Sequence, residues 1–130
     1  MKLYLAPMEA LTGYIYRNAY HHFFDDADRY FTPFIASKKL NSKEKNDIIP
    51  EHNSGINVIP QILTNRSDEF IYIANRLKEF YGYEEVNLNL GCMISSDKGY
   101  LLYISRIDAH SSEFSTPVLV LIEILVLQPS

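Results

Sequence analysis

The sequence predicts an α/β fold in which parallel strands alternate with helices. Three observations favour this class: short apolar runs end in proline or a polar residue, helical patterns separate these runs, and the runs are spaced as repeating strand–helix units. Such alternation is typical of parallel strands joined by right-handed crossovers, with helices covering the sheet. The carboxyl ends of these strands open onto one shared face, where we expect a site.

The first predicted strand is Lys2–Ala6, which runs into Pro7 and Met8. Apolar residues at helical spacing then predict a helix over Tyr14–Phe24, which ends before the next strand. We expect its apolar face to consist of Ile15, Ala19, His22 and Phe23. Neighbouring helical residues face directions about 100° apart, so His21 and His22 do not make a metal pair, and no metal site is predicted.

The second predicted strand is Arg29–Phe31, which runs into Thr32-Pro33-Phe34. Either Asn41 or Ser42 can cap a short helix that stops before Pro50. The third predicted strand is Asn57–Pro60, and it leads into Gln61.

The clearest helix follows this third strand. Asn65 can cap it, Asp68 lies favourably in its first turn, and Gly82 supplies the stop. Its apolar stripe consists of Phe70, Ile73, Ala74, Leu77 and Phe80. A strand over Glu85–Leu90 comes next. The apolar segment Val118–Leu127 is predicted as a further buried strand, since about 20 residues are needed to cross a bilayer.

The segment from Asn87 to Cys92 places the single cysteine where a strand runs out into a loop. Gly91 permits an unusual turn there, so Cys92 stands at the carboxyl end of the strand, where barrel enzymes keep their catalytic groups. A buried, inert cysteine is the alternative that the residues alone leave open. One cysteine excludes an internal disulfide, and the first apolar run is too short for a signal peptide, so we expect a cytoplasmic protein.

The composition predicts one soluble globular domain: the chain has 130 residues, of which 47% are hydrophobic and 22% charged. A net charge of −4 argues against general nucleic-acid binding, although a local basic patch is compatible with it. The candidates for such a patch are Lys38, Lys39, Lys43 and Lys45. A solvated helix face or loop is the alternative, because acidic residues interleave with these lysines.

Four segments together resemble the flavin-dependent tRNA-dihydrouridine synthases: LAPMEALTGYIYR, YFTPFI, VIPQILTNRSDEF and GYEEVNLNLGC. They stand in the family's order and cover Met1 to Cys92. The resemblance implies an FMN-bearing (β/α)₈ barrel followed by a small helical domain. It also implies NADPH as reductant, tRNA as partner, and reduction of uridine to 5,6-dihydrouridine.

By the same resemblance, Pro7 and Met8 lie against the flavin, Gln61 hydrogen-bonds its polar edge, and Asn89 lies near flavin and substrate. Cys92 is implied as the proton donor. Hydride from reduced FMN reaches C6 of the uracil, and the charge that develops toward C5 needs a proton. A thiol with a reference pKa of about 8.5 is mostly protonated at neutral pH and suits this role. The alternative is that these residues have only structural roles. Pro7 and Gly91 then shape turns, Met8 packs in the core, and Gln61 or Asn89 hydrogen-bonds to the backbone of a loop.

After Cys92 the sequence departs from the family: Met93 replaces a proline, the following loop is shorter, and no lysine follows Lys98. Upstream, Ala10 stands where a glycine is usual. A (β/α)₈ barrel takes about 250 residues. We therefore expect residues 1–130 to be a single truncated barrel segment of four to five strands, family-like over 1–92 and altered over 93–130. The second barrel half and the helical domain are absent from it.

We expect such a segment to be inactive by itself and to associate through its open sheet edge. Two alternatives stay open. Another FMN barrel, such as a dihydroorotate dehydrogenase, also carries asparagine and cysteine near a strand end, but the PMEALT and TPFI motifs disfavour it. A non-catalytic tRNA-binding remnant is the other. Neither a membrane nor a metal is expected as a partner.

Overall fold

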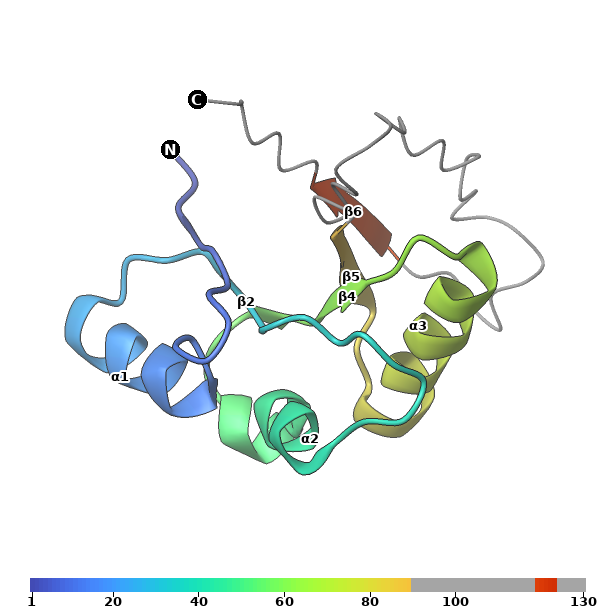
Figure 1. Cartoon of the computed structure of the whole chain (residues 1–130). Helices are drawn as coiled ribbons and strands as arrows, with labels where there is room; N and C mark the ends of the chain where they lie inside the picture. Colours follow the sequence, from blue (N-terminus) through green and yellow to red (C-terminus); the bar gives the residue numbers. More distant parts are fainter. Residues whose placement is uncertain (90–118, 124–130) are drawn as a thin grey trace, which may run out of the picture.

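The computed structural model describes residues 1–89 and 119–123, and within them parallel strands alternate with helices (Figure 1). The elements are, in chain order, β1 (Tyr4–Leu5), α1 (Tyr14–Phe24), β2 (Arg29–Phe31), α2 (Ser42–Ile48), the 3₁₀ turn η1 (Pro50–Asn53), β3 (Val58–Ile59), β4 (Gln61–Leu63), α3 (Ser67–Tyr81), β5 (Glu85–Asn89) and β6 (Leu119–Glu123). The strands form two sheets, ordered β1-β2-β3 and β4-β5-β6, and every pairing is parallel. The α/β class is confirmed, and the described strands do not close into a barrel.

The third predicted strand is wrong in its extent, because the chain forms β3 before Pro60 and β4 after it. Proline has no N–H to donate to a ladder. The Pro60 carbonyl still accepts from the backbone N–H of Asn87 at 2.9 Å, and Ile35 bridges to Ile62 in parallel fashion. This segment therefore touches strands on both sides, and Gln61 lies within a strand instead of after one.

The other predicted strands agree with the structure to different degrees. β1 covers only Tyr4–Leu5 of the predicted Lys2–Ala6, so this prediction is wrong at both ends. β6 lies inside the predicted Val118–Leu127, and the rest of that predicted strand lies outside the described residues. β2 agrees with its prediction. β6 pairs with β5 from Glu85↔Leu119 to Asn89↔Glu123 and is the end strand of its described sheet.

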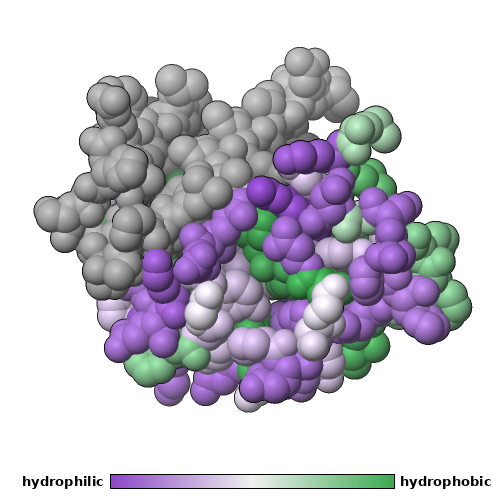
Figure 2. Space-filling model, turned by 180° about the vertical axis from the view of Figure 1, so that it is seen from behind, coloured by the Kyte–Doolittle hydropathy of each residue, from purple (hydrophilic) through white to green (hydrophobic). Residues whose placement is uncertain are grey.

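Helix α1 has its predicted bounds, but its predicted apolar face is wrong. Ile15 and Phe23 are 69% and 76% exposed, whereas Arg17 is fully buried. The reason is that Arg17 finds hydrogen-bond acceptors on α2 and η1, so the helix turns its charged side inward. Seen from behind, apolar side chains are exposed at the right edge of the molecule, on the side where α1 lies (Figure 2).

Helices α2 and α3 start differently from each other. Asn41 caps α2, with its side chain accepting from the Glu44 N–H and the Glu44 carboxylate accepting in return. At α3 the cap position is Arg66, one residue after the predicted Asn65, and no side chain caps it. The hydroxyl of Thr64 accepts from the Arg66 N–H at 3.2 Å instead.

The main core lies between α3 and the β4–β5 pair. It consists of Ile35, Ile48, Ile62, Phe70, Ile73, Ala74, Leu77, Val86 and Leu88. Phe80, the last member of the predicted stripe, is 57% exposed and packs under Arg76. Since alternate strand residues face opposite sides of a sheet, Val86 and Leu88 meet this core while Asn87 and Asn89 face away from it. None of the helices within residues 1–89 is long and apolar enough to span a membrane.

Candidate active site

Three carboxamide side chains form a hydrogen-bonded row on the face of β4 and β5 that α3 does not cover. Gln61 Nε2 donates to Asn87 Oδ1 at 2.8 Å, and Asn89 Nδ2 donates to Gln61 Oε1 at 3.1 Å. The strand register sets this arrangement, because Gln61 pairs with Asn87, and Asn89 follows two residues later on the same face. We call these residues the amide row.

The amide row keeps unused hydrogen-bonding capacity. A carboxamide offers two N–H donors and two acceptor lone pairs, and the two bonds above use one donor and one acceptor of Gln61. Asn87 is fully buried, and its Nδ2 has no hydrogen-bond partner within the described part of the chain. A buried N–H without a partner costs about 1–3 kcal/mol, so a ligand atom that accepts from it recovers that free energy.

Thr32 fixes the backbone on which the row stands. Its buried hydroxyl donates to the Pro33 carbonyl at 2.9 Å and accepts from the Gln61 backbone N–H at 3.1 Å. The Thr32 N–H in turn donates to the Ile59 carbonyl. The end of β2 is therefore tied to both halves of the β3–β4 segment, and the position of Gln61 is fixed through its main chain.

The predicted residues Pro7 and Met8 lie on the loop between β1 and α1, which Thr12 closes. The Met8 N–H donates to Thr12 Oγ1 at 2.7 Å, and the Met8 carbonyl accepts from the N–H groups of Leu11 and Thr12. The Met8 side chain is 59% exposed, so it does not fill the core. Pro7 is half-buried. The loop thus holds its backbone tightly while it presents an apolar side chain outward.

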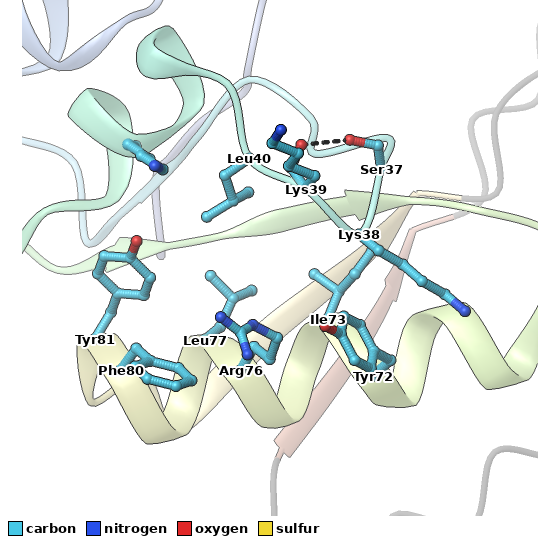
Figure 3. Close-up of a pocket in the computed structure, with 11 residues that line it drawn as sticks. Ser37, Lys38, Lys39, Leu40, Tyr72, Ile73, Arg76, Leu77, Phe80 and Tyr81 are labelled. Atoms are coloured by element: carbon cyan, nitrogen blue, oxygen red, sulfur yellow. Dashed lines mark hydrogen bonds between the residues drawn. The ribbon is translucent and has the colours of Figure 1, made fainter.

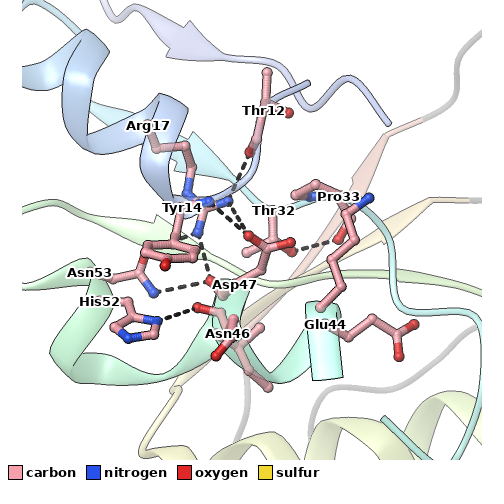
Figure 4. Close-up of polar contacts among 12 residues, drawn as sticks. Thr12, Tyr14, Arg17, Thr32, Pro33, Glu44, Asn46, Asp47, His52 and Asn53 are labelled. Carbon is pink, nitrogen blue, oxygen red and sulfur yellow. Dashed lines mark hydrogen bonds and ion pairs between the residues drawn. The ribbon is translucent and has the colours of Figure 1, made fainter. Parts of the chain in front are cut away.

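A buried arginine joins this loop to the helices beneath it (Figure 4). The Arg17 guanidinium donates to the carbonyls of Thr12 and Asp47 at 2.9 and 2.6 Å, and to Asn53 Oδ1 at 2.9 Å. The Asp47 carboxylate lies 3.8 Å away and accepts from the Tyr14 N–H at 2.7 Å. Burial lowers the pKa of Arg17, while the nearby Asp47 charge opposes that shift.

Sequence reasoning missed Arg17 and Asn87. No periodic signal marks Arg17, because a charged residue within an amphipathic pattern is ordinarily assigned to the solvent side. Asn87 could have been found, since strand alternation places it on the same face as Asn89. The side chains of Gln61 and Asn89, both predicted, are in direct contact. None of the described hydrogen bonds joins them to the Pro7–Met8 loop, and Cys92 lies outside the described residues.

His21 of α1 has local polar partners. His21 Nδ1 lies 3.1 Å from both the Tyr30 hydroxyl and an Asp25 carboxylate oxygen. Across residues 1–89 and 119–123, no group of three or more metal-binding side chains comes together.

Residues 4–99 match the family described as Dihydrouridine synthase (Dus). The chain belongs to the dihydrouridine synthase family. No curated protein and no solved structure matches it. The resemblance drawn from the four sequence segments is thereby confirmed, and the match continues past Cys92 to residue 99.

Membership places the chain among TIM-barrel oxidoreductases that modify tRNA. The parallel α/β arrangement of this dihydrouridine synthase segment is consistent with part of such a barrel. The amide row and the Pro7–Met8 loop both lie within the matched residues, as does Cys92.

Proposed function

We propose that this chain carries the flavin-contacting part of a tRNA-dihydrouridine synthase, which reduces uridine to 5,6-dihydrouridine in tRNA with FMN and NADPH. The amide row carries the proposal, because it is a set of neutral donors and acceptors that includes a buried N–H with no partner among the described residues. It lies within the residues that match the family.

The amide row suits the polar edge of a flavin, which alternates carbonyl oxygens with ring nitrogens. Gln61 has one donor and one acceptor left for such an edge, and Asn87 Nδ2 supplies a further donor. Pro7 and Met8 offer an apolar surface and a fixed backbone for the ring. FMN, when bound and reduced, supplies the hydride for C6 of the uracil.

Two residues act on the substrate in this proposal. Asn89 orients the uracil through its carboxamide, and the Cys92 thiol gives its proton to C5 as charge develops there. The remaining polar side chains of the site are neutral amides that do not titrate near neutral pH. Because the target base must leave the RNA stack, the site works on a base that has been flipped out of the helix.

We further propose that residues 1–130 form a single barrel segment, which binds flavin weakly and does not catalyse uridine reduction by itself. A closed barrel takes eight strands, whereas the strands within residues 1–89 and 119–123 make two open three-stranded sheets. An open site leaves the flavin in contact with water and provides fewer contacts to hold it.

Flavin binding to the purified 130-residue chain tests this function, with FMN fluorescence quenching as the measurement. In Asn87→Asp the acceptor Oδ1 is kept and the unpartnered Nδ2 is replaced by oxygen. We expect FMN to bind about tenfold more weakly, because one donor is lost and a buried charge is added. Asn65→Asp makes the same chemical change at an exposed loop position and should leave FMN affinity unchanged.

Three outcomes count against the proposal. Equal FMN affinity for Asn87→Asp and Asn65→Asp would show that the amide row does not contact FMN. A folded chain, checked by circular dichroism, that binds no FMN would refute the flavin assignment. NADPH-dependent formation of dihydrouridine in tRNA by the 130-residue chain would refute its inactivity.

A further inference from the structure

A pocket of about 400 Å³ lies between the loop that leads into α2 and one side of α3 (Figure 3). Its walls carry four cations, Lys38, Lys39, Lys45 and Arg76, and we call it the basic pocket. Its volume falls within the range of about 300–1,000 Å³ that is typical of ligand sites. It is separate from the amide row, because α3 covers the opposite face of β4 and β5.

The basic pocket concentrates positive charge in a protein whose net charge is −4. None of the described residues that line it carries a carboxylate. Lys38 Nζ lies 3.8 Å from an Asp68 oxygen that Arg66 already engages at 3.0 Å, while Lys39, Lys45 and Arg76 form no ion pair within residues 1–89. An anion in the pocket thus meets several cations that no neighbouring carboxylate neutralises.

Lys43 does not belong to this pocket, although the sequence grouped it with the other lysines. Its ammonium pairs with Glu9 at 2.9 Å, and hydrogen bonding to that carboxylate raises the pKa of Lys43. The predicted patch of Lys38, Lys39, Lys43 and Lys45 is therefore divided. Arg76, which is distant in sequence, takes the place of Lys43 in the cationic wall.

Aromatic rings hold two of the cations without using their hydrogen-bond donors. The Arg76 guanidinium carbon lies 4.3 Å from the centre of the Phe80 ring and 5.8 Å from that of Tyr72. Lys38 Nζ lies 5.4 Å from the Tyr72 ring centre. A guanidinium held by its face keeps its planar edge of N–H groups for a phosphate. Tyr72 and Phe80 are 42% and 57% exposed and offer ring surface to a base.

The floor of the pocket is apolar, with Leu40, Ile73 and Leu77. Cations, exposed rings and an apolar floor match a ligand that joins a phosphate to a planar base. Proteins that bind single-stranded nucleic acid combine backbone-tracking cations with stacking aromatics in this way. A bare phosphate would use the cations alone and leave the rings and the floor without a role.

We propose that the basic pocket binds a nucleotide of a single-stranded RNA segment, with its phosphate at Arg76 and the lysines and its base against Tyr72 and Phe80. The choice of RNA rests on the proposed function, whose substrate is tRNA. The pocket lies on the outer, helical side of the sheet, so it holds the RNA at a point remote from the base that reacts. It thereby adds affinity without touching the chemistry.

Fluorescence anisotropy of the 130-residue chain with a labelled single-stranded RNA of about 12 nucleotides tests the pocket. Arg76→Gln should weaken binding about fivefold or more, and the plot of log affinity against log salt should become shallower by about 0.7, the value of one phosphate contact on a single strand. Phe80→Leu should weaken binding with the slope unchanged, because stacking releases no counterion. Both side chains are exposed, so both variants are expected to fold.

Lys2→Gln is the matched control, since it removes one positive charge from an exposed position far along the chain from the pocket. If Arg76→Gln and Lys2→Gln lowered RNA affinity equally, the RNA would be bound by general charge attraction, and the assignment of the pocket as the RNA site would be wrong. A competition experiment distinguishes a nucleotide site from a site for phosphate alone. Uridine monophosphate should displace the RNA more strongly than inorganic phosphate does. Equal displacement by the two would leave an anion site without base contact and would overturn the nucleotide assignment.

Two variants separate RNA binding at the basic pocket from FMN binding at the amide row. Arg76→Gln should leave FMN affinity unchanged, and Asn87→Asp should leave RNA affinity unchanged. A joint loss in either variant would show that the two surfaces are not independent and would contradict the remote placement of the pocket.

Discussion

At the scale of single residues, the buried Arg17 is held by hydrogen bonds from several elements. Arg17 has no exposed surface. Its two terminal nitrogens donate to three acceptors, and within the described residues only its Nε lacks a partner. Removing one member of such a buried network lowers the free energy of unfolding by more than the whole network contributes to it, because the remaining buried groups lose their partners. Arg17 thus positions the Pro7–Met8 loop through Thr12.

Ala10 is a second residue whose conformation matters, since its φ of 63° lies in the left-handed region. A non-glycine residue there is disfavoured by about 1–2 kcal/mol, and glycine's greater freedom in the unfolded chain offsets part of this. We predict that Ala10→Gly raises the free energy of unfolding by about 0.5–1 kcal/mol, measured by urea denaturation.

The control for this prediction makes the same change inside a helix. Ala19 is exposed on α1, where glycine lowers stability by about 1 kcal/mol. Opposite signs for Ala10→Gly and Ala19→Gly support relief of strain at residue 10. A loss of stability in both would show that the left-handed conformation of Ala10 is not strained.

At the scale of elements, Tyr83 links the end of α3 to the end of α2. Gly82 ends α3 in the left-handed conformation, and the Tyr83 hydroxyl then donates to the Ile48 carbonyl at 2.6 Å. Burial raises the pKa of Tyr83 to about 12, while the Arg17 charge acts in the opposite direction. The folded chain therefore keeps this proton at pH values where the unfolded chain, with a tyrosine pKa of about 10, releases it.

Because the pKa of Tyr83 is higher in the folded chain than in the unfolded chain, we predict that the folded chain loses stability at alkaline pH. The contribution of Tyr83 is fully present below about pH 10 and is lost as pH rises from about 10 towards 12. At neutral pH Tyr83→Phe should cost about 1 kcal/mol for the lost hydrogen bond. As pH rises above about 10, the stability gap between the wild type and Tyr83→Phe should close and then reverse.

Urea titrations at about pH 8 and about pH 11 measure this gap. Tyr72→Phe is the control, because Tyr72 is exposed and its ring can be kept while the hydroxyl is lost. A gap between the wild type and Tyr83→Phe that stays constant with pH would contradict the burial of Tyr83 in the folded chain.

At the scale of the whole molecule, the described sheets are open. β6 pairs with β5 on one side, and within the described strands it has no neighbour on the other. An unpaired strand edge is a template for pairing with another chain, and a lysine placed on it opposes that pairing. We predict that the 130-residue chain associates as its concentration rises and that Val120→Lys lowers this association in sedimentation velocity experiments.

Ile15→Lys is the matched variant, because it adds the same charge on the exposed face of α1. If association falls with Ile15→Lys and not with Val120→Lys, the contact runs through the apolar surface of α1 instead of the sheet edge. If the wild type associates and neither variant lowers this association, then neither the sheet edge nor the apolar surface of α1 forms the contact.

The local order of the chain could be predicted from its sequence because it depends on neighbouring residues. Alternating patterns predicted the α/β class, Asn41 was one of two predicted caps, and Gly82 marked the end of α3, all of which the structure confirms. The four ordered segments identified the family, which the match over residues 4–99 confirms. These features need only the spacing of side chains along one strand or helix.

Only the tertiary structure decided which surfaces meet. The sequence assigned Ile15 and Phe23 to the inside of α1, but Arg17 is buried there because its acceptors come from α2 and η1, thirty or more residues away. The amide row likewise depends on the register between β4 and β5, and the basic pocket on the approach of Arg76 to Lys38. By itself the sequence determined the family and the alternation of strands with helices, whereas the site geometry arises from long-range contacts that no local pattern encodes.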